Sequence, residues 1–393
     1  MGDAAGNEDR GTGTETGGAA GLSAFIIDSA TRVAIGLCLL FAAVPIGTAL
    51  YRWRTLRIPA PADAGRVTLV LPYAPPGDLT PLLHALAGQS LCPTRLIIAV
   101  ADLADTPALP PMPFPCDVVV AGRATMRGQK CHNQLAALDA LRGDEDAIVL
   151  LDADIRPQPW WLAVLVAPVL GGTRPCTGGY RWVSPSPHPA AQAVAWLDRG
   201  WAVLIKPFFC GIAWGGSLAL GPPLLRLLRA SLDRALSDDL VFARRAHAAG
   251  APVVMRGASL VPSPLGADAL AFWTRQLRII RLHNAPLWWS SVATAASMLA
   301  LWSLALAGTG WLLALLLAGG AVRAVCQDIL ARRIDAPDPP ATRLWQAVCA
   351  LTPLPDAIQA WCLARSAFGR RVTWRGITYS VARDGSARVE TDR

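Results

Sequence analysis

Charged residues are scarce in this sequence. They make up 16% of the 393 residues, whereas hydrophobic residues make up 53%. This composition is too apolar for an ordinary soluble domain, so membrane-spanning segments are expected. The net charge of +8 comes largely from arginines, which cluster beside apolar runs. Their placement favours membrane orientation and anionic lipid headgroups, and it disfavours nucleic acid as the partner.

Paired cysteines are also missing. The nine cysteines are scattered singly and include no Cys-x-x-Cys pair, which disfavours a zinc site. Their odd number and wide spacing are typical of reduced thiols facing cytosol or lipid rather than of a disulfide scaffold. Residues 1–22 have almost no large apolar side chain, and we expect a disordered tail over residues 1–30.

An uncharged apolar run covers residues 33–50 and is followed directly by Arg52 and Arg54. As a helix this run would span roughly 27 Å, close to the thickness of a bilayer core. The basic flank follows an acidic tail, so we expect a transmembrane anchor over residues 31–52 with the N-terminus outside. A secretory signal peptide is the alternative, and the late start of the run disfavours it.

Short β-rich runs alternate with helical stretches over residues 60–285. This alternation predicts an α/β domain whose parallel sheet is covered by helices on both faces. The candidate strands are residues 67–72, 96–101, 117–121 and 147–151.

Two further apolar runs, at 287–307 and 311–326, are separated by a Gly-Thr-Gly turn. They predict a transmembrane hairpin. The next run, 344–364, contains two prolines and has arginines on both sides, which favours a kinked or re-entrant segment over a simple span. We therefore expect membrane helices over residues 286–366 and a cytoplasmic tail over residues 367–393.

Two carboxylates, Asp152 and Asp154, end an apolar candidate strand. In open α/β sheets, ligands bind beyond the carboxyl ends of the strands. Two acids at this spacing can share Mg²⁺ or Mn²⁺, which neutralises a diphosphate. The alternative is a helix cap, because Pro157 and Pro159 indicate a helix start nearby.

Three more acids stand where a strand ends or a helix begins. Asp102 follows the candidate strand 96–101, where it can accept hydrogen bonds from a nucleotide or remain a solvated loop acid. Asp238 and Asp239 precede an amphipathic stretch. They fit a helix cap that gains from the helix dipole, or a general base that takes the proton of an acceptor hydroxyl.

Three basic residues are candidates for phosphate contacts. Arg275 and Arg278 fall on one face of a predicted helix, and paired guanidiniums can hold diphosphate oxygens. The alternative for this pair is a positive-inside flank of the hairpin. Lys130 follows Gly128 and opens a predicted helix, where it can contact phosphate or remain a solvated loop lysine.

The order of these motifs resembles the ceramide glucosyltransferase family and the related bacterial hopanoid glycosyltransferases. Both belong to the inverting GT-A glycosyltransferases. The resemblance runs from about residue 33 to about residue 380, and it includes the Gly215-Gly216-Ser217 and Val372-Thr373-Trp374-Arg375-Gly376 segments. It implies a Rossmann-like domain that binds a nucleotide-sugar, most simply a UDP-sugar.

The resemblance also implies roles for individual residues. Asp102 matches the family aspartate at the nucleotide, and Asp152 and Asp154 match the aspartates at the metal and donor phosphates. Asp239 matches the catalytic base.

A basic motif of the family is matched as well, with one departure. Arg275-Gln276-Leu277-Arg278 is similar to the family's Gln/Arg-x-x-Arg-Trp motif. Ile279 stands where the family has Trp, so the aromatic wall that this residue would supply is missing.

Taken together, the sequence predicts a membrane-bound inverting glycosyltransferase whose catalytic domain faces the cytoplasm. The expected acceptor is a membrane lipid, with ceramide or another sphingolipid first and a hopanoid second. One alternative is a processive polysaccharide synthase, which needs more spans than this chain offers. The other is a catalytically silent membrane scaffold, which the intact set of acids argues against.

Overall fold

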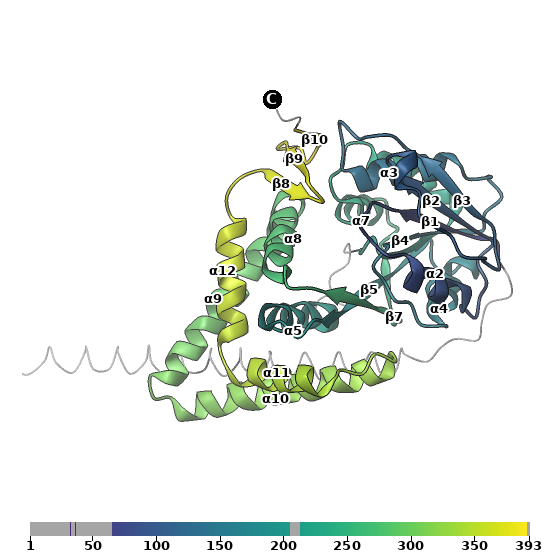
Figure 1. Cartoon of the computed structure of the whole chain (residues 1–393). Helices are drawn as coiled ribbons and strands as arrows, with labels where there is room; N and C mark the ends of the chain where they lie inside the picture. The colour runs from purple at the N-terminus through teal and green to yellow at the C-terminus, as the bar shows by residue number, and fades with distance from the viewer. Residues whose placement is uncertain (1–31, 33–35, 37–64, 205–212, 391–393) are drawn as a thin grey trace, which may run out of the picture.

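The computed structural model describes residues 32, 36, 65–204 and 213–390 of the chain (Figure 1). The predicted tail and anchor over residues 1–52 therefore lie outside the described residues, apart from two single positions. Their predicted topology stays a prediction.

A seven-stranded sheet in the order β3-β2-β1-β4-β6-β5-β7 forms the centre of the α/β domain. Its strands are β1 (Val67–Pro72), β2 (Arg95–Val100), β3 (Cys116–Val120), β4 (Ala147–Leu151), β5 (Cys176–Pro185), β6 (Ser217–Leu220) and β7 (Val254–Leu265). The four candidate strands correspond to β1–β4, and these pair in parallel as expected. The fully parallel sheet was wrong, because β6 runs antiparallel to both β4 and β5.

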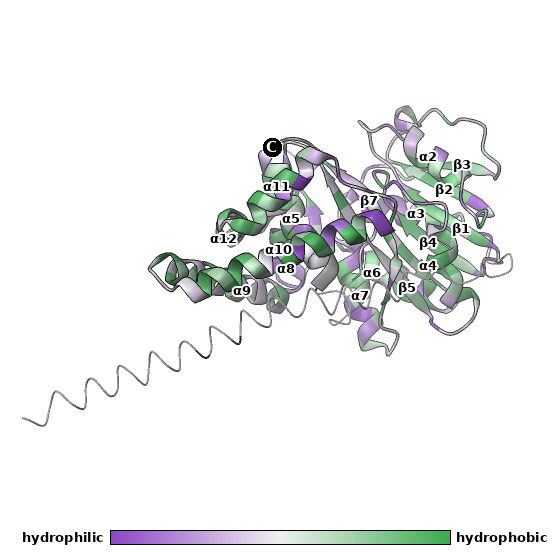
Figure 2. Ribbon diagram, turned by 90° about the horizontal axis from the view of Figure 1, so that it is seen from below, coloured by the Kyte–Doolittle hydropathy of each residue, from purple (hydrophilic) through white to green (hydrophobic). Residues whose placement is uncertain are grey.

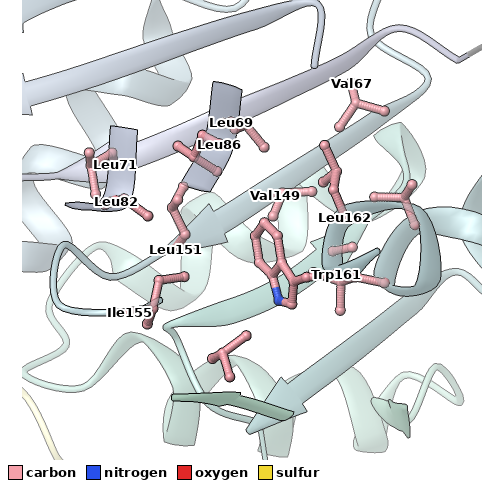
Figure 3. Packing of buried hydrophobic residues seen from close by; sticks show 14 of the residues in the cluster. Val67, Leu69, Leu71, Leu82, Leu86, Val149, Leu151, Ile155, Trp161 and Leu162 are labelled. Atoms are coloured by element: carbon pink, nitrogen blue, oxygen red, sulfur yellow. The ribbon is translucent and has the colours of Figure 1, made fainter. Parts of the chain in front are cut away.

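Helices cover both faces of this sheet, which confirms the predicted fold class. On one face lie α2 (Thr80–Ala87) and α4 (Trp161–Leu170); on the other lie α3 (Gln129–Asp139), α6 (Leu225–Leu232) and α7 (Asp238–Ala248). Successive side chains of a strand point to opposite faces of the sheet, which explains why there are two cores. Leu69 and Leu71 of β1 pack toward α2 and α4 together with Trp161 (Figure 3). Val70, between them, packs in the other core.

The remaining helices are α5 (Pro189–Leu204), α8 (Ala269–His283), α9 (Ala285–Leu306), α10 (Gly310–Arg333), α11 (Pro340–Leu351) and α12 (Leu354–Ser366). Both α9 and α10 are long and apolar enough to cross a membrane, with mean hydropathies of 1.4 and 1.6. Helices α11 and α12 meet at an 81° bend, where the sequence predicts a kink. In Figure 1, α10 and α11 lie side by side next to α5.

Buried polar contacts fix these helices to the α/β domain. Both terminal nitrogens of Arg199, in α5, donate to the Asp338 carboxylate at 2.6 and 2.7 Å. Gln346 of α11 donates to the same carboxylate at 2.7 Å. At the end of α10, Ile334 is fully buried, and its carbonyl accepts a hydrogen bond from Gln158 at 2.6 Å. The apolar helices therefore hold a defined position relative to the sheet.

A second, antiparallel sheet lies in the segment that we expected to be a tail. It consists of β8 (Arg371–Trp374), β9 (Ile377–Val381) and β10 (Ala387–Val389). Arg375 and Gly376 form the turn between β8 and β9 with φ of 48° and 78°. Two successive positive φ values are typical of a type I′ hairpin turn.

Candidate active site

Lys130 joins the two acid pairs that the sequence singled out. It lies in the first turn of α3, and its Nζ is 2.7 Å from Asp152 at the end of β4 and 3.1 Å from Asp238 at the start of α7. Gln134, one turn later in α3, donates to the same oxygen of Asp238 at 2.7 Å. Lys130 is therefore not a solvated loop lysine, because its side chain is only 16% exposed and holds one member of each pair.

Burial and nearby charges shift the pKa of Lys130 in opposite directions. Burial lowers the pKa of Lys130, but Asp152, Asp238 and Asp239 outweigh that effect, so the pKa lies well above its ordinary value. Burial raises the pKa of Asp152 to about 6, although Lys130 opposes the shift. Asp154 and Asp238 raise it further by repulsion. The cluster thus concentrates negative charge around one ammonium group.

The second member of each pair is left outside this ion pairing. Asp154 is exposed, and Asp239 is partly exposed where Asp238 is buried. The backbone holds Asp239 in place, since one carboxylate oxygen accepts from the Leu240 N–H at 2.7 Å and the other from the Gly215 N–H at 3.4 Å. Asp239 also accepts a hydrogen bond from the Ser237 hydroxyl. Its carboxylate is oriented without being neutralised by a described cation.

Glycine is required at position 215 by the closeness of the ion pair. A Cβ there would lie 2.3 Å from an Asp238 oxygen and 2.7 Å from Lys130 Nζ. Next to it, the ring of Trp214 packs edge-on against Tyr180 of β5 with their centroids 5.8 Å apart. The sequence offered no signal for these two aromatics, because their contact joins β5 to the segment before β6.

Arg181, next to Tyr180, is a basic residue that the sequence analysis missed. It donates to the fully buried Asp198 of α5 from two nitrogens, at 2.5 to 3.1 Å. Asp154 is among the carboxylates that raise the pKa of Arg181, after the opposing effect of burial and the larger effect of Asp198. This places a fixed positive charge within the electrostatic reach of Asp154.

The remaining predicted site residues lie apart from the Lys130 cluster. Asp102 is exposed at the end of β2 and caps a short 3₁₀ turn by accepting from Ala104 N–H at 3.1 Å. Arg278 donates to the carbonyls of Arg365 and Arg371 at 2.8 and 3.3 Å, so it secures the end of α12 and the start of β8. Neither contact tests a role in binding a nucleotide-sugar.

Ile279 has a structural explanation. It is buried in an apolar cluster with Leu236 and with residues of the C-terminal sheet such as Val372 and Tyr379. Trp374 packs against the same cluster, and the Arg275 guanidinium lies over its ring, 6.0 Å from the centroid. Aromatic rings thus accompany Arg275 after all, since Phe272 of α8 lies 5.6 Å from its guanidinium and Trp374 of β8 adds a second ring.

The donor atoms of Asp152 and Asp154 fit a hard divalent cation. Carboxylate oxygens are preferred ligands of Mg²⁺ and Mn²⁺, and one or two carboxylates suffice when substrate phosphates complete the coordination. Asp154 makes no ion pair in the described part of the chain, and Asp152 uses only one oxygen for Lys130. No cluster of three or more acidic, His or Cys side chains is available to a metal among the described residues.

Comparison with solved structures finds glycosyltransferases. The mannosyltransferase PcManGT from Pyrobaculum calidifontis, in complex with GDP-Man and Mn²⁺, is 18% identical with a TM-score of 0.44, over 86% of this chain and 97% of that one. Glucosyl-3-phosphoglycerate synthase from Mycobacterium tuberculosis, in complex with Mn²⁺ and uridine-diphosphate-glucose, is 16% identical with a TM-score of 0.30, over 51% and 70% of the two chains.

No curated protein matches the sequence. A family match covers the part of the chain that holds Asp238, Asp239, the Arg275 motif, the apolar helices and most of the C-terminal sheet: residues 228–387 match glycosyl transferase family 21. This match confirms the predicted resemblance to the ceramide glucosyltransferase family over residues 228–387, which are less than half of the chain.

Proposed function

We propose that this protein transfers a sugar from a nucleotide-sugar to the hydroxyl group of a membrane lipid, with inversion at the sugar carbon. A ceramide or another sphingolipid is the first acceptor class and a hopanoid is the second. The observation that carries the proposal is the different surroundings of two adjacent acids in one helical turn. Asp238 is buried against Lys130, whereas Asp239 accepts hydrogen bonds from backbone N–H groups and forms no ion pair among the described residues.

Asp239 is suited to the role of general base. Direct displacement requires a carboxylate that takes the proton of the acceptor hydroxyl as its oxygen bonds to the sugar carbon. The bond from that carbon to the phosphate oxygen breaks on the opposite face, and the nucleoside diphosphate leaves with the electron pair. The N–H groups of Gly215 and Leu240 fix both carboxylate oxygens of Asp239. A positioned base of this kind contributes roughly 10²–10⁴-fold to the rate.

The donor would lie at the carboxyl end of β4. Asp152 and Asp154 would hold Mg²⁺ or Mn²⁺, which would neutralise the diphosphate and favour its departure. Lys130 keeps one oxygen of Asp152 in place at 2.7 Å. Among the predicted donor contacts, Asp102 is exposed at the end of β2, which β1 separates from β4, and it can accept from the ribose or base of the nucleotide.

The surface of the C-terminal helices supports a lipid environment. Large apolar side chains stand exposed on them, among them Trp289 at 63%, Leu306 at 68% and Leu344 at 69% exposure. Figure 2 shows hydrophobic residues along α9, α10, α11 and α12. Exposed apolar surface of this extent is typical of a membrane contact. The catalytic domain would then face the cytoplasm, where nucleotide-sugars are found.

Two alternatives predict different products. A processive synthase adds many sugars and needs an export channel, whereas the described helices offer two, or at most three, segments long and apolar enough to cross a membrane. A silent scaffold would not need the free carboxylates of Asp154 and Asp239, or the glycine that admits the Lys130–Asp238 pair.

The test is transfer by the purified protein in nanodiscs. UDP-sugars are supplied with Mn²⁺ and either ceramide or a hopanoid, and products are identified by mass spectrometry. We expect one sugar on one lipid, with no polymer. A lipid that stays unmodified with every donor would contradict the proposal, and a ladder of sugars would favour the synthase. Release of free sugar without a lipid product would mean that neither of the supplied lipids is the acceptor.

A further inference from the structure

The C-terminal sheet is docked on loops that shape the donor side of the site. Tyr379 accepts a hydrogen bond from the Gln129 N–H at 3.2 Å, directly before Lys130. The N–H groups of Ala387 and Val389 each donate at 2.8 Å, to the carbonyls of Arg234 and Thr125. The sheet therefore bridges two loops. One leads into α3, whose first turn carries Lys130, and the other leads into α7, whose first turn carries Asp239.

Arg375, at the tip of this sheet, reaches a third loop of the same region. It donates a hydrogen bond to the carbonyl of Ala74, just beyond β1. β1 is the neighbour of β4 and runs parallel to it, so its end lies on the same edge of the sheet as Asp152. The side chain of Arg375 is exposed, and this hydrogen bond occupies one of its five donors.

The backbone at Arg375 is unusual for a residue of this size. Its φ is 48°, in the left-handed region, and Gly376 follows with φ 78°. Asn-Gly is the common pair in such a turn because Asn tolerates positive φ. A long cationic side chain held at this position is the kind of backbone outlier that points to a function.

Arg275 lies beside the same turn, because its guanidinium contacts the ring of Trp374, the residue before Arg375. Its Nε is buried without a hydrogen-bond partner, and its guanidinium lies over Phe272 and Trp374 at 5.6 and 6.0 Å. Burial lowers the pKa of Arg275; Asp268 opposes that lowering, and the charge of Arg375 adds to it. Within the described residues, no carboxylate is at ion-pair distance from either arginine.

We propose that Arg275 and Arg375 form a two-guanidinium clamp for the diphosphate of the nucleotide-sugar. Two neighbouring guanidiniums without acids suit a diphosphate, because its oxygens accept their forked N–H groups and neutralise both charges. Arg375 thus takes the place that spacing assigned to Arg278, whose two terminal nitrogens are already bonded to carbonyls. This inference rests on the proposed glycosyl transfer.

The test variant is Arg375→Asn, which removes the charge but suits the left-handed turn, so the sheet keeps its fold. Arg388→Asn is the matched control. Arg388 is also exposed on the C-terminal sheet, but among the described residues its side chain makes no hydrogen bond to a loop of the site. Binding of UDP and of uridine to the full chain in nanodiscs is measured by calorimetry with Mn²⁺ present. Melting temperature reports the fold.

We expect Arg375→Asn to weaken UDP binding by about 10–100-fold, the usual effect of losing one charge-assisted hydrogen bond. Uridine binding and the melting temperature should stay close to wild type, and Arg388→Asn should bind UDP normally. Unchanged UDP affinity in Arg375→Asn, an equal loss in Arg388→Asn, or a wild-type protein that binds UDP no more tightly than uridine would each overturn the clamp. UDP binding needs no acceptor, so failed sugar transfer by wild type would contradict the proposed function alone.

Discussion

The acid pair at the end of β4 and the acid pair at the start of α7 have the same arrangement around Lys130. In each pair one carboxylate, Asp152 or Asp238, is bound to Lys130. The other, Asp154 or Asp239, stays outside the ion pair. The pairs differ in exposure, because Asp154 is open to solvent while Asp239 is partly covered and held by two backbone N–H groups.

This comparison separates positioning from chemistry. The shared lysine brings the strand end and the helix start together, so the two free carboxylates are carried on one rigid frame. An exposed carboxylate suits a metal ion and phosphates, whereas a partly covered and oriented carboxylate suits proton transfer. The lysine explains why one acid of each pair is held in an ion pair, while the other acid stays outside that pair.

Removal of the lysine should have the largest effect on the frame. Lys130→Met leaves the buried Asp238 carboxylate facing the half-buried Asp152, and breaking a buried pair in this way costs about 3–5 kcal/mol of unfolding free energy. Denaturant unfolding would measure it. Arg127→Met is the control, because Arg127 pairs with the exposed Asp233 nearby and should cost at most about 1 kcal/mol. Equal losses in both variants would show that Lys130 does not join the acid pairs.

Loss of the exposed carboxylate should affect ligand binding alone. Asp154→Ala should weaken Mn²⁺-dependent UDP binding by at least about tenfold, as expected for a group that orients a metal. Its stability should change by less than about 0.5 kcal/mol, because Asp154 is exposed and carries no ion pair among the described residues. Asp144→Ala, another exposed acid, is the binding control. Full transfer activity in excess chelator would contradict the metal site.

Local sequence patterns were enough for the framework of the domain. The first four strands are continuous apolar runs, and the long apolar helices and the proline-broken bend follow directly from composition. β6 has only four residues and follows two glycines, so no pattern marked it as the antiparallel strand that mixes the sheet. The strands of the C-terminal sheet have three to five residues each, too few to mark a sheet, and for that reason the sequence predicts a tail there.

The site could be predicted as a set of residues but not as an arrangement. Spacing placed Arg275 and Arg278 on one helix face, yet the carbonyls that bind Arg278 belong to residues 87 and 93 positions away. Lys130 likewise finds Asp238 more than a hundred residues along the chain. Such partners depend on how elements pack, and no local pattern encodes them.

The most direct measurement compares the turnover of Asp239→Asn and Asp238→Asn in lipid glycosylation. Asn keeps one acceptor oxygen, which is enough at position 239 for the shorter hydrogen bond from the Leu240 N–H, but it takes no proton. We expect Asp239→Asn to lower kcat by roughly 10²–10⁴-fold with normal UDP binding and melting temperature. Asp238→Asn should lower the melting temperature, because it weakens the contact with Lys130, and should change kcat far less. Near-normal turnover in Asp239→Asn, or a dead Asp238→Asn that folds normally, would contradict the assignment of Asp239 as the base.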